Sequence, residues 1–379
     1  MKKFSGFNFK NKTVLLRCDF NVPISENGEV LDDFRIRKTI PTIKYLIKQN
    51  AKIVLMSHLE IRKKDLSLSC IVPKLNELLD KKVELLTDYL ESDANERIKR
   101  MRAGEIVLLE NLRFHKEEEE NNQEFAKKIS ELADFFVNEA FSVSHRNHAS
   151  IVSIPRYLPG TIGILFEKEL AVLSKVSENP KRPFVVILGG VKVQTKVKTV
   201  INLLEKSDYM LLGSKIGEAI LSEKGILSQR DFKRYGLVAK IDITNLKIHL
   251  PLDGFIGLKD SMNHLRIGTI GTLKKEEDIY DIGPETIKLF TRIIKKAKTI
   301  LWNGPLGMCE DERFETGTKE ILNAVVSNKS AFKVAGGGNT ISVITKFGLI
   351  DGFDFLSTGG GAMLKFLTGE KLPGLEALN

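Results

Sequence analysis

Short apolar runs that alternate with longer helical patterns constrain the fold of this chain most strongly. In the first half the runs lie at 13–20, 52–56, 105–110 and 134–140; in the second half they lie at 184–190, 208–213, 247–257, 299–304, 332–338 and 354–361. Nearly all are continuously apolar, which is typical of strands buried on both faces. Strands that alternate with helices predict parallel sheets covered by helices on both sides. We therefore expect an α/β protein.

A helical pattern at 166–177 separates the two halves. It is broken at Asn179, Pro180 and Pro183, and proline ends or kinks a helix. With 379 residues the chain is long enough for two hydrophobic cores. We expect two Rossmann-like three-layer domains with a boundary near residue 180, joined by an interdomain helix, with a cleft between them.

The composition excludes several classes of protein. Cys18, Cys70 and Cys309 are too far apart for a zinc motif or a disulfide framework. No apolar stretch approaches the ~20 residues of a membrane span, so we expect a cytoplasmic protein that does not bind membranes. The formal net charge of +9 fits an acidic small substrate or a lysine-rich surface. A nucleic-acid-binding protein is a third possibility, but no aromatic pattern typical of RNA-binding modules accompanies the charge, and we expect no nucleic-acid partner.

Glycines follow the apolar runs of the second half. Glycines at such places let backbone N–H groups approach a phosphate at the start of a helix, so the repeated pattern predicts a nucleotide site in this half. Neither a P-loop motif nor a dinucleotide fingerprint accounts for them. The positions are Gly189, Gly190, Gly213, Gly304, Gly336, Gly337, Gly338, Gly359, Gly360 and Gly361.

Charged and amide side chains follow the runs of the first half instead. Guanidinium and imidazole groups that converge from several loops bind small polyanions, which is the function we expect here. Arg35 precedes a helix that we expect to begin near Pro41, and the acidic run at 115–122 is expected to be a solvated helix start. The residues at the strand ends are Arg17, Asp19, Asn21, His58, Asn111, Arg113, Asn138, His145, Arg146 and His148.

Segments along essentially the whole chain resemble, in order, the signature segments of the phosphoglycerate kinase family. Agreement of many segments in one order is far more specific than any single motif. The segments are RCDFNVP at 17–23, DDFRIRKTIPTIKYL at 32–46, ENLRFHKEEE at 110–119, HRNHASIVSIPRYLPG at 145–160, LGGVKVQTKV at 188–197, DIGPETIKLF at 281–290, WNGPLGMCE at 302–310, AGGGNT at 335–340 and STGGGAMLKFLTGEKLPGLEAL at 357–378.

The resemblance implies a division of labour between the domains. Residues 1–167 with the tail 365–379 would bind 3-phosphoglycerate, 168–183 would form the interdomain helix and hinge, and 184–364 would bind the nucleotide. Hinge closure would then bring the two substrates together and exclude water. Implied substrate-binding residues are Asp19, Asn21, Arg35, His58, Arg113, His145 and Arg146, with Arg17 in the same basic cluster.

The resemblance also implies roles in the second domain. Arg35, Lys196, Gly359 and Gly360 would act on the transferring phosphoryl group, and Asn339 would contact the magnesium ion that accompanies ATP or ADP. The implied nucleotide-binding residues are Gly190, Lys192, Lys196, Gly213, Asn303, Glu310, Gly337, Gly338, Asn339 and Thr340.

The chain departs from the family pattern at a few of these places. Asn339 replaces the aspartate that holds magnesium, which predicts weaker metal binding. Ser214 and Lys215 replace glycines beside the nucleotide, and Lys215 would either obstruct the pocket or contact a phosphate. Thr195 replaces an acidic residue next to Lys196, and Cys309 replaces an aromatic residue.

Another departure lies in the first domain. Glu60 and Ile61 stand where the family has glycine and a basic residue, and the loop is shorter. Arg62 is one candidate for the basic role, which the alignment does not assign to a single residue of 60–62. The expected function is reversible phosphoryl transfer between 1,3-bisphosphoglycerate and ADP, by a monomer. The alternative is a degenerate relative that binds a phosphorylated anion without turnover.

Overall fold

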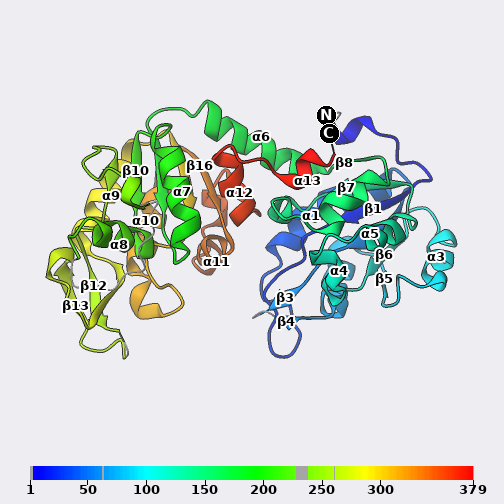
Figure 1. The fold of residues 1–379 in the computed structure, drawn as a ribbon, viewed down its shortest axis with the longest axis horizontal. Coiled ribbons are helices and arrows are strands. Elements are labelled where there is room, and N and C mark those ends of the chain that lie inside the picture. The colour runs from blue at the N-terminus through cyan, green and yellow to red at the C-terminus, as the bar shows by residue number, and fades with distance from the viewer. Residues whose placement is uncertain (1–2, 62–63, 228–237, 260, 379) are drawn as a thin grey trace. The chain divides into compact units, whose positions relative to one another are not determined.

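The protein consists of two compact units. The computed structural model describes residues 3–61, 64–227, 238–259 and 261–378 (Figure 1). Contacts between residues group Met1–Ala171 with Glu370–Asn379 in a first unit and Val172–Gly369 in a second. The chain passes from one to the other within helix α6, Ile164–Glu178.

The first unit is built on a parallel sheet with the strand order β5-β6-β2-β1-β7-β8. Each of the four apolar runs of the first half contains one of its strands, so the expected parallel sheet is confirmed. The strands are β1 Thr13–Arg17, β2 Lys52–Met56, β5 Val83–Leu86, β6 Ile106–Leu109, β7 Phe135–Asn138 and β8 Gly160–Ile162, with a small hairpin of β3 Glu60–Ile61 and β4 Lys64–Asp65.

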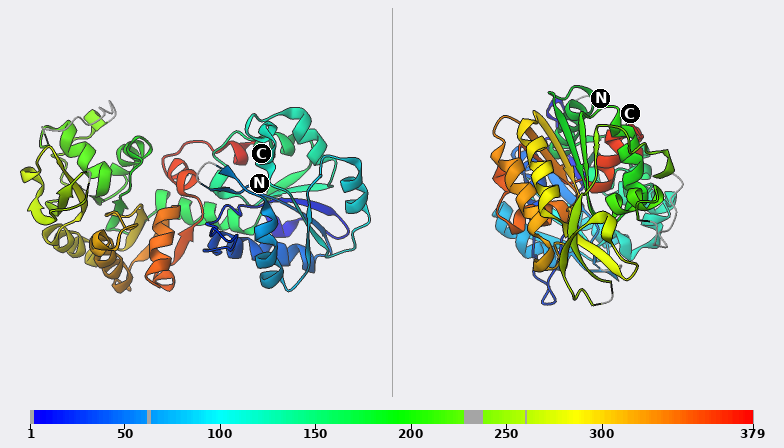
Figure 2. Two further views of the ribbon diagram at one scale, coloured as in Figure 1. Left: turned by 90° about the horizontal axis from the view of Figure 1, so that it is seen from below. Right: turned by 90° about the vertical axis from the view of Figure 1, so that its left-hand side faces the viewer.

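Both faces of this sheet are covered by helices (Figures 1 and 2). Along β1, Val14 and Leu16 point into one hydrophobic core while Leu15 points into the other. Successive side chains of a strand face opposite ways, so continuously apolar strands require a core on each side. The helices are α1 Phe34–Lys48, α2 Val72–Leu79, α3 Ser92–Lys99, α4 Lys116–Glu119 and α5 Gln123–Ser130.

The predicted start of the first helix near Pro41 is wrong. Helix α1 begins at Phe34, whose backbone N–H donates to Asp32 Oδ1 at 2.9 Å, and Pro41 lies inside the helix. Proline removes one helical hydrogen bond but does not end a helix whose apolar face is packed, and Ile36, Ile40 and Ile43 are buried on both sides of it. Arg35 therefore stands on the first turn of α1.

The last residues of the chain pack on the first unit. Helix α13, Pro373–Glu376, belongs to this unit, and Gly374 donates its N–H to the carbonyl of Ser144 at 2.9 Å.

Glu139, which is buried, accepts hydrogen bonds from the N–H groups of Leu165 and Phe166 at the start of α6. Burial raises the pKa of Glu139 to about 7.

The second unit contains a parallel sheet with the order β11-β10-β9-β15-β16-β17 and a separate antiparallel sheet with the order β13-β12-β14. Its strands are β9 Phe184–Leu188, β10 Tyr209–Leu212, β11 Ile248–His249, β12 Asp253–Leu258, β13 Arg266–Thr269, β14 Glu277–Ile282, β15 Thr299–Asn303, β16 Phe332–Gly336 and β17 Phe355–Ser357. Its helices are α7 Val193–Leu204, α8 Ser214–Glu223, α9 Pro284–Lys296, α10 Thr316–Ser327, α11 Gly338–Lys346 and α12 Gly360–Leu367.

The apolar run at 247–257 is not one strand. It holds β11, which joins the parallel sheet, and β12, which joins the antiparallel sheet, with Pro251 between them. Proline lacks the N–H that a central strand position needs, which explains the break. Within the described ranges, no helix has both the length and the apolar character needed to cross a bilayer.

Candidate functional site

Four guanidinium groups of the first unit gather around His58. Burial, and then repulsion from Arg17, Arg113, Arg146 and Arg35, lower the pKa of His58 well below its usual range. Each arginine reaches this place from a different part of the unit, namely the end of β1, the turn after β6, the segment after β7 and the first turn of α1. The polar residues that follow the strands of the first half therefore do converge.

The buried imidazoles of this cluster are neutral. Arg17 Nη2 lies 3.3 Å from His58 Nδ1, and because arginine can only donate, Nδ1 accepts and the ring proton is on Nε2. Burial, followed by repulsion from Arg146, lowers the pKa of His148 to about 3. His145 is half-buried beside Arg146. His58 and His148 therefore add no positive charge at neutral pH, and the fixed positive charge beside them comes from guanidinium groups.

Asp19 and Asn21 orient Arg35. Arg35 Nη1 lies 2.9 Å from Asp19 Oδ2 and donates to the carbonyl of Asn21 at 3.0 Å. Asp19 also accepts hydrogen bonds from the N–H of Asn21 and from the hydroxyl of Ser142. The Arg35 side chain is thus held in place by Asp19 and Asn21, which lie on the loop after β1.

Glu118 pairs with Arg17, as Asp19 pairs with Arg35. Its carboxylate lies 3.9 Å from Arg17 Nη2 and accepts from the N–H of Ser150 at 2.8 Å, and all three side chains are buried. The prediction of a solvated helix start holds for Glu119 and Glu120, which are exposed, but is wrong for Glu118. Sequence reasoning missed this residue because an acidic run on a short helix gives no sign of which member points inward.

Arg113 is buried and only partly bonded. Its Nη1 donates to the carboxylate of Glu60, and Glu119 Oε1 lies 3.3 Å from its Nε. Its Nε and Nη2 have no hydrogen-bond partner. Arg146 has no carboxylate oxygen within 4.0 Å among the described residues. Arg62, one candidate for a basic role here, lies outside the described residues.

In the second unit, helices begin at the carboxyl ends of the parallel strands. Lys192, Gly213, Gly337 and Gly359 are the residues that precede helices α7, α8, α11 and α12. A Cβ atom on Gly360 would lie 3.1 Å from the Cα of Gly337, so the last two turns are in contact. Free N–H groups at helix starts favour anions, and several such starts at one sheet edge are suited to phosphates.

Lys196 lies at the centre of these turns. Its Nζ donates to the carbonyls of Gly189 and, at 2.9 Å, Asn303. Burial, and then repulsion from Lys192, lower the pKa of Lys196 to about 7. Gly304 has a φ of +94°, and a Cβ there would lie 2.3 Å from the Nζ of Lys196, so only glycine fits. The amine has no carboxylate partner among the described residues, and Thr195 provides none.

Two further predicted residues tie the turns together. Asn303 Nδ2 donates to the carbonyl of Gly336 at 2.7 Å, and Thr340 Oγ1 accepts from the N–H of Gly304 at 2.7 Å. A side chain on Gly337 would meet the amide of Asn303. These contacts hold β15 and the start of α11 in one fixed arrangement.

A pocket of about 170 Å³ adjoins these turns. The structure brings Gly190, Ser214, Lys215, Glu310 and Asn339 together in its wall, whereas Lys192, Gly213, Asn303, Gly337, Gly338 and Thr340 do not line it. The rest of the wall is mainly apolar, with Leu221, Pro251, Ile279, Tyr280, Ile282, Leu306 and Met308.

Lys215 is held by carboxylates in this wall. Its Nζ lies 3.0 Å from Glu218 and 2.6 Å from Asp278. Ser214, the residue before it, has a φ of +52°, the left-handed conformation that a glycine would adopt without strain. No group of three or more metal-ligating side chains occurs among the described residues, so any metal here would depend on ligands from a bound molecule.

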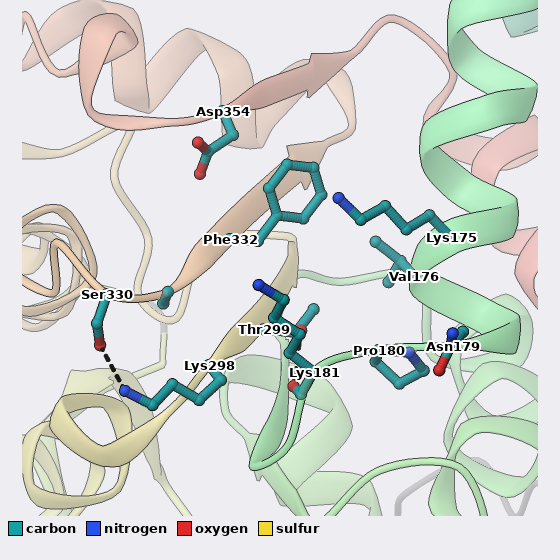
Figure 3. Close-up of a pocket in the computed structure, with 11 residues that line it drawn as sticks. Lys175, Val176, Asn179, Pro180, Lys181, Lys298, Thr299, Ser330, Phe332 and Asp354 are labelled. Atoms are coloured by element: carbon teal, nitrogen blue, oxygen red, sulfur yellow. Dashed lines mark hydrogen bonds between the residues drawn. The ribbon is translucent and has the colours of Figure 1, made fainter.

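A separate pocket of about 190 Å³ lies at the opposite, amino end of this sheet (Figure 3). Lys175, Lys181 and Lys298 line it, with Lys175 Nζ 4.3 Å from the centre of the Phe332 ring and Lys298 donating to Ser330. The lysines stand at or just after the ends of α6 and α9, where cations stabilise helix C-termini. This pocket contains none of the predicted site residues.

The fold and these sites define a two-domain α/β protein with an arginine cluster on one unit and glycine-lined helix starts on the other. The family model for phosphoglycerate kinase matches residues 4–370. The chain belongs to the phosphoglycerate kinase family.

Individual relatives agree over the full length. The chain is 41% identical to the phosphoglycerate kinase of Dictyoglomus turgidum, with 98% of this chain and 96% of the relative covered. It is 41% identical to that of Finegoldia magna, with 100% and 99% covered. Solved phosphoglycerate kinases of Pyrococcus horikoshii and Coxiella burnetii, both 34% identical, match with TM-scores of 0.87 and 0.80; they cover 100% and 99% of this chain, and 98% of each is covered.

Replacement of Glu118 tests whether the arginine cluster depends on buried carboxylates. Glu118→Gln would leave the Arg17 guanidinium buried without its counter-charge, so we expect a loss of about 2–4 kcal/mol in unfolding free energy. Glu120→Gln, which removes an exposed charge from the same helix end, should change it by less than about 0.5 kcal/mol. Urea unfolding measures both, and equal midpoints for the two variants would contradict the assignment.

Proposed function

We propose that this chain catalyses reversible transfer of a phosphoryl group between 1,3-bisphosphoglycerate and ADP, giving 3-phosphoglycerate and ATP. The single observation that carries the proposal is the convergence of Arg17, Arg35, Arg113 and Arg146 on His58, in a chain whose relatives are phosphoglycerate kinases over their full length. The alternative, an anion-binding relative without turnover, gains no support from these relatives.

The first unit would bind the phosphoglycerate side. A phosphate and a carboxylate together need several donors in fixed positions, and guanidinium groups supply them in pairs. Arg113 has unbonded donors, and Arg146 has no carboxylate oxygen of the described residues within 4.0 Å, so both have binding capacity left. Arg35 is already oriented by Asp19 and Asn21 and would contact the transferring group. His58 and His145 would complete the substrate-binding set.

The second unit would bind the nucleotide. The mainly apolar pocket is smaller than the ~300 Å³ at the lower end of typical ligand sites, so it would hold one part of the nucleotide, with Glu310 for the ribose hydroxyls. Its phosphates would lie at the helix starts near Lys192, Lys196 and Asn303. Gly190, Gly213, Gly337, Gly338 and Thr340 would let the backbone approach them.

Catalysis by these residues would consist of positioning and charge stabilisation. Phosphoryl transfer passes through a transition state whose charge lies on the equatorial oxygens, and the protein contributes little covalent chemistry. Lys196 would neutralise that charge together with Arg35 and the N–H groups near Gly359 and Gly360. Because burial keeps the pKa of Lys196 near 7, a bound phosphate would draw a proton onto its amine.

Magnesium would be held chiefly by the nucleotide phosphates. Asn339 is exposed on the first turn of α11 and lines the pocket, so its amide oxygen could be one ligand. An amide oxygen is an acceptable but uncharged ligand for this hard cation. Bound magnesium would supply positive charge that offsets the negative charge of the phosphates.

The proposal includes the assignment of whole segments. Residues 1–167 with 365–379 would form the 3-phosphoglycerate domain, 168–183 the hinge, and 184–364 the nucleotide domain. We also propose that the chain acts as a cytoplasmic monomer, since its small soluble substrates require neither a membrane nor a second copy.

A coupled assay across a magnesium titration, with ATP, GTP and their diphosphates, tests the function. We expect turnover that saturates at high magnesium in the native chain. Asn339→Asp should lower the half-saturating magnesium concentration about tenfold, because a carboxylate adds a full charge to the ligand set. Asn11→Asp, which adds the same charge at an exposed site of the first unit, should leave it unchanged. Absence of turnover at every magnesium concentration would contradict the proposal.

Protonation of Lys196 gives a second test. At pH 8 the free amine is mostly neutral, so binding of a nucleoside diphosphate should take up close to one proton; at pH 6 the amine is already charged and takes up none. Calorimetry in two buffers of different ionisation enthalpy measures the uptake. Lys196→Gln should abolish it at pH 8, whereas Lys198→Gln, on an exposed position of the same helix, should not. Equal heats in both buffers at pH 8 would exclude this role of Lys196.

A further inference from the structure

Glu60 lies at the arginine cluster, at a position where the family pattern has no side chain. The pattern has glycine there, whereas this chain places a carboxylate that accepts a hydrogen bond from Arg113 Nη1. A glycine would leave that donor to a ligand. The substitution therefore adds a negative charge within the proposed substrate-binding residues.

The backbone around Glu60 is fixed. Asn111 Nδ2 donates to the carbonyls of Leu59 and Leu66 at 2.8 and 2.7 Å, which closes the base of the β3–β4 hairpin. The N–H of Glu60 donates to Asn21 Oδ1 at 3.0 Å. The Glu60 side chain itself is 33% exposed, so it can rotate toward solvent without any change in the hairpin.

Arg113 is in the opposite situation. Its side chain is 4% exposed and two of its donor nitrogens are buried without a hydrogen bond. Buried unbonded donors on a charged group are costly, and a ligand with several oxygens would satisfy them. Glu60 satisfies Nη1. Nε lies 3.3 Å from Glu119 Oε1 without a hydrogen bond, and Nη2 has no hydrogen-bond partner, so both can bond to such a ligand.

The charge of Glu60 also affects the pKa of Arg146. Burial lowers the pKa of Arg146, and Glu60 is one of the carboxylates that act against this effect, together with Asp19 and Glu119. The carboxylate of Glu60 therefore lies within the field of both arginines that have binding capacity left. An anion that binds to them meets a like charge.

We propose that Glu60 sets the affinity of the first unit for phosphorylated anions, as an internal counter-ion of Arg113 that an incoming phosphate displaces or shares. A phosphate ester carries about −1.5 to −2 charges and three acceptor oxygens, so it competes well against one carboxylate. The competition nevertheless weakens binding relative to a cluster without Glu60. The identity of the anion as 3-phosphoglycerate rests on the proposed function; the competition itself does not.

Calorimetric titration of the full chain with 3-phosphoglycerate, and separately with inorganic phosphate, tests this inference. Glu60→Gln keeps the size of the side chain and removes its charge, so 3-phosphoglycerate should bind about tenfold more tightly, and the gain should shrink as salt rises. Glu60→Gly, the residue of the family pattern, should change affinity in the same direction. Glu96→Gln removes a carboxylate that pairs with exposed Arg100 and should leave the affinity as it is.

The outcomes separate the inference from the function on which its ligand depends. If both Glu60 variants fold, as judged by thermal unfolding, and bind 3-phosphoglycerate no more tightly than the native chain, the inference is wrong while the proposed function stands. If no form binds 3-phosphoglycerate but Glu60→Gln binds inorganic phosphate more tightly than the native chain, the function fails and the inference holds. Unchanged binding of both anions overturns the inference.

Discussion

The balance of charge around buried arginines is the constraint on which the first unit depends. A guanidinium cannot lose its proton, so each one buried at the sheet edge needs a carboxylate or a ligand. Each of three arginines pairs with a carboxylate: Arg17 with Glu118, Arg35 with Asp19 and Arg113 with Glu60. The local structure follows from these pairs, because the loop after β1, helix α4 and the β3–β4 hairpin are each held where their carboxylate meets an arginine. Arg146 has no carboxylate oxygen of the described residues within 4.0 Å and is left to a ligand.

The second unit has fewer charged side chains at its proposed anion site. Helix starts at the carboxyl ends of β9, β10, β16 and β17 supply N–H groups, and glycines keep the approach open. Lys196 is the only cation placed deep among the described turns, and burial rather than a carboxylate governs its pKa. The two units thus offer different chemistry: fixed positive charge on one, and backbone donors with one titratable amine on the other.

The sequence predicts the frame of both units well and their polar contacts poorly. Continuous apolar runs identify buried parallel strands, because only burial on both faces permits them. The prediction of one strand at 247–257 is wrong because a proline divides two strands of different sheets. The predicted helix start near Pro41 is wrong because a packed helix tolerates an internal proline. The strands β5, β8, β13 and β14 are not predicted because none of them lies in a long apolar run.

Site residues show the same contrast. Arginines and glycines at strand ends are found because every parallel strand ends at the same edge of its sheet. Their partners are not found: nothing in the sequence near Glu118 or Lys215 indicates that one meets Arg17 and the other meets Asp278. Such pairs join segments far apart in the chain, and only the fold brings them together.

The most direct test of this account is the affinity for 3-phosphoglycerate after Arg146→Met, measured by calorimetry. Among the described residues Arg146 forms no ion pair within 4.0 Å, so its guanidinium is available to the ligand. Its loss should weaken binding about 10- to 100-fold while ADP binding is retained. Arg156→Met, which removes an exposed charge ten residues further along the chain, should have no such effect. Undiminished binding of 3-phosphoglycerate by Arg146→Met would contradict the claim that the arginine cluster is the substrate site.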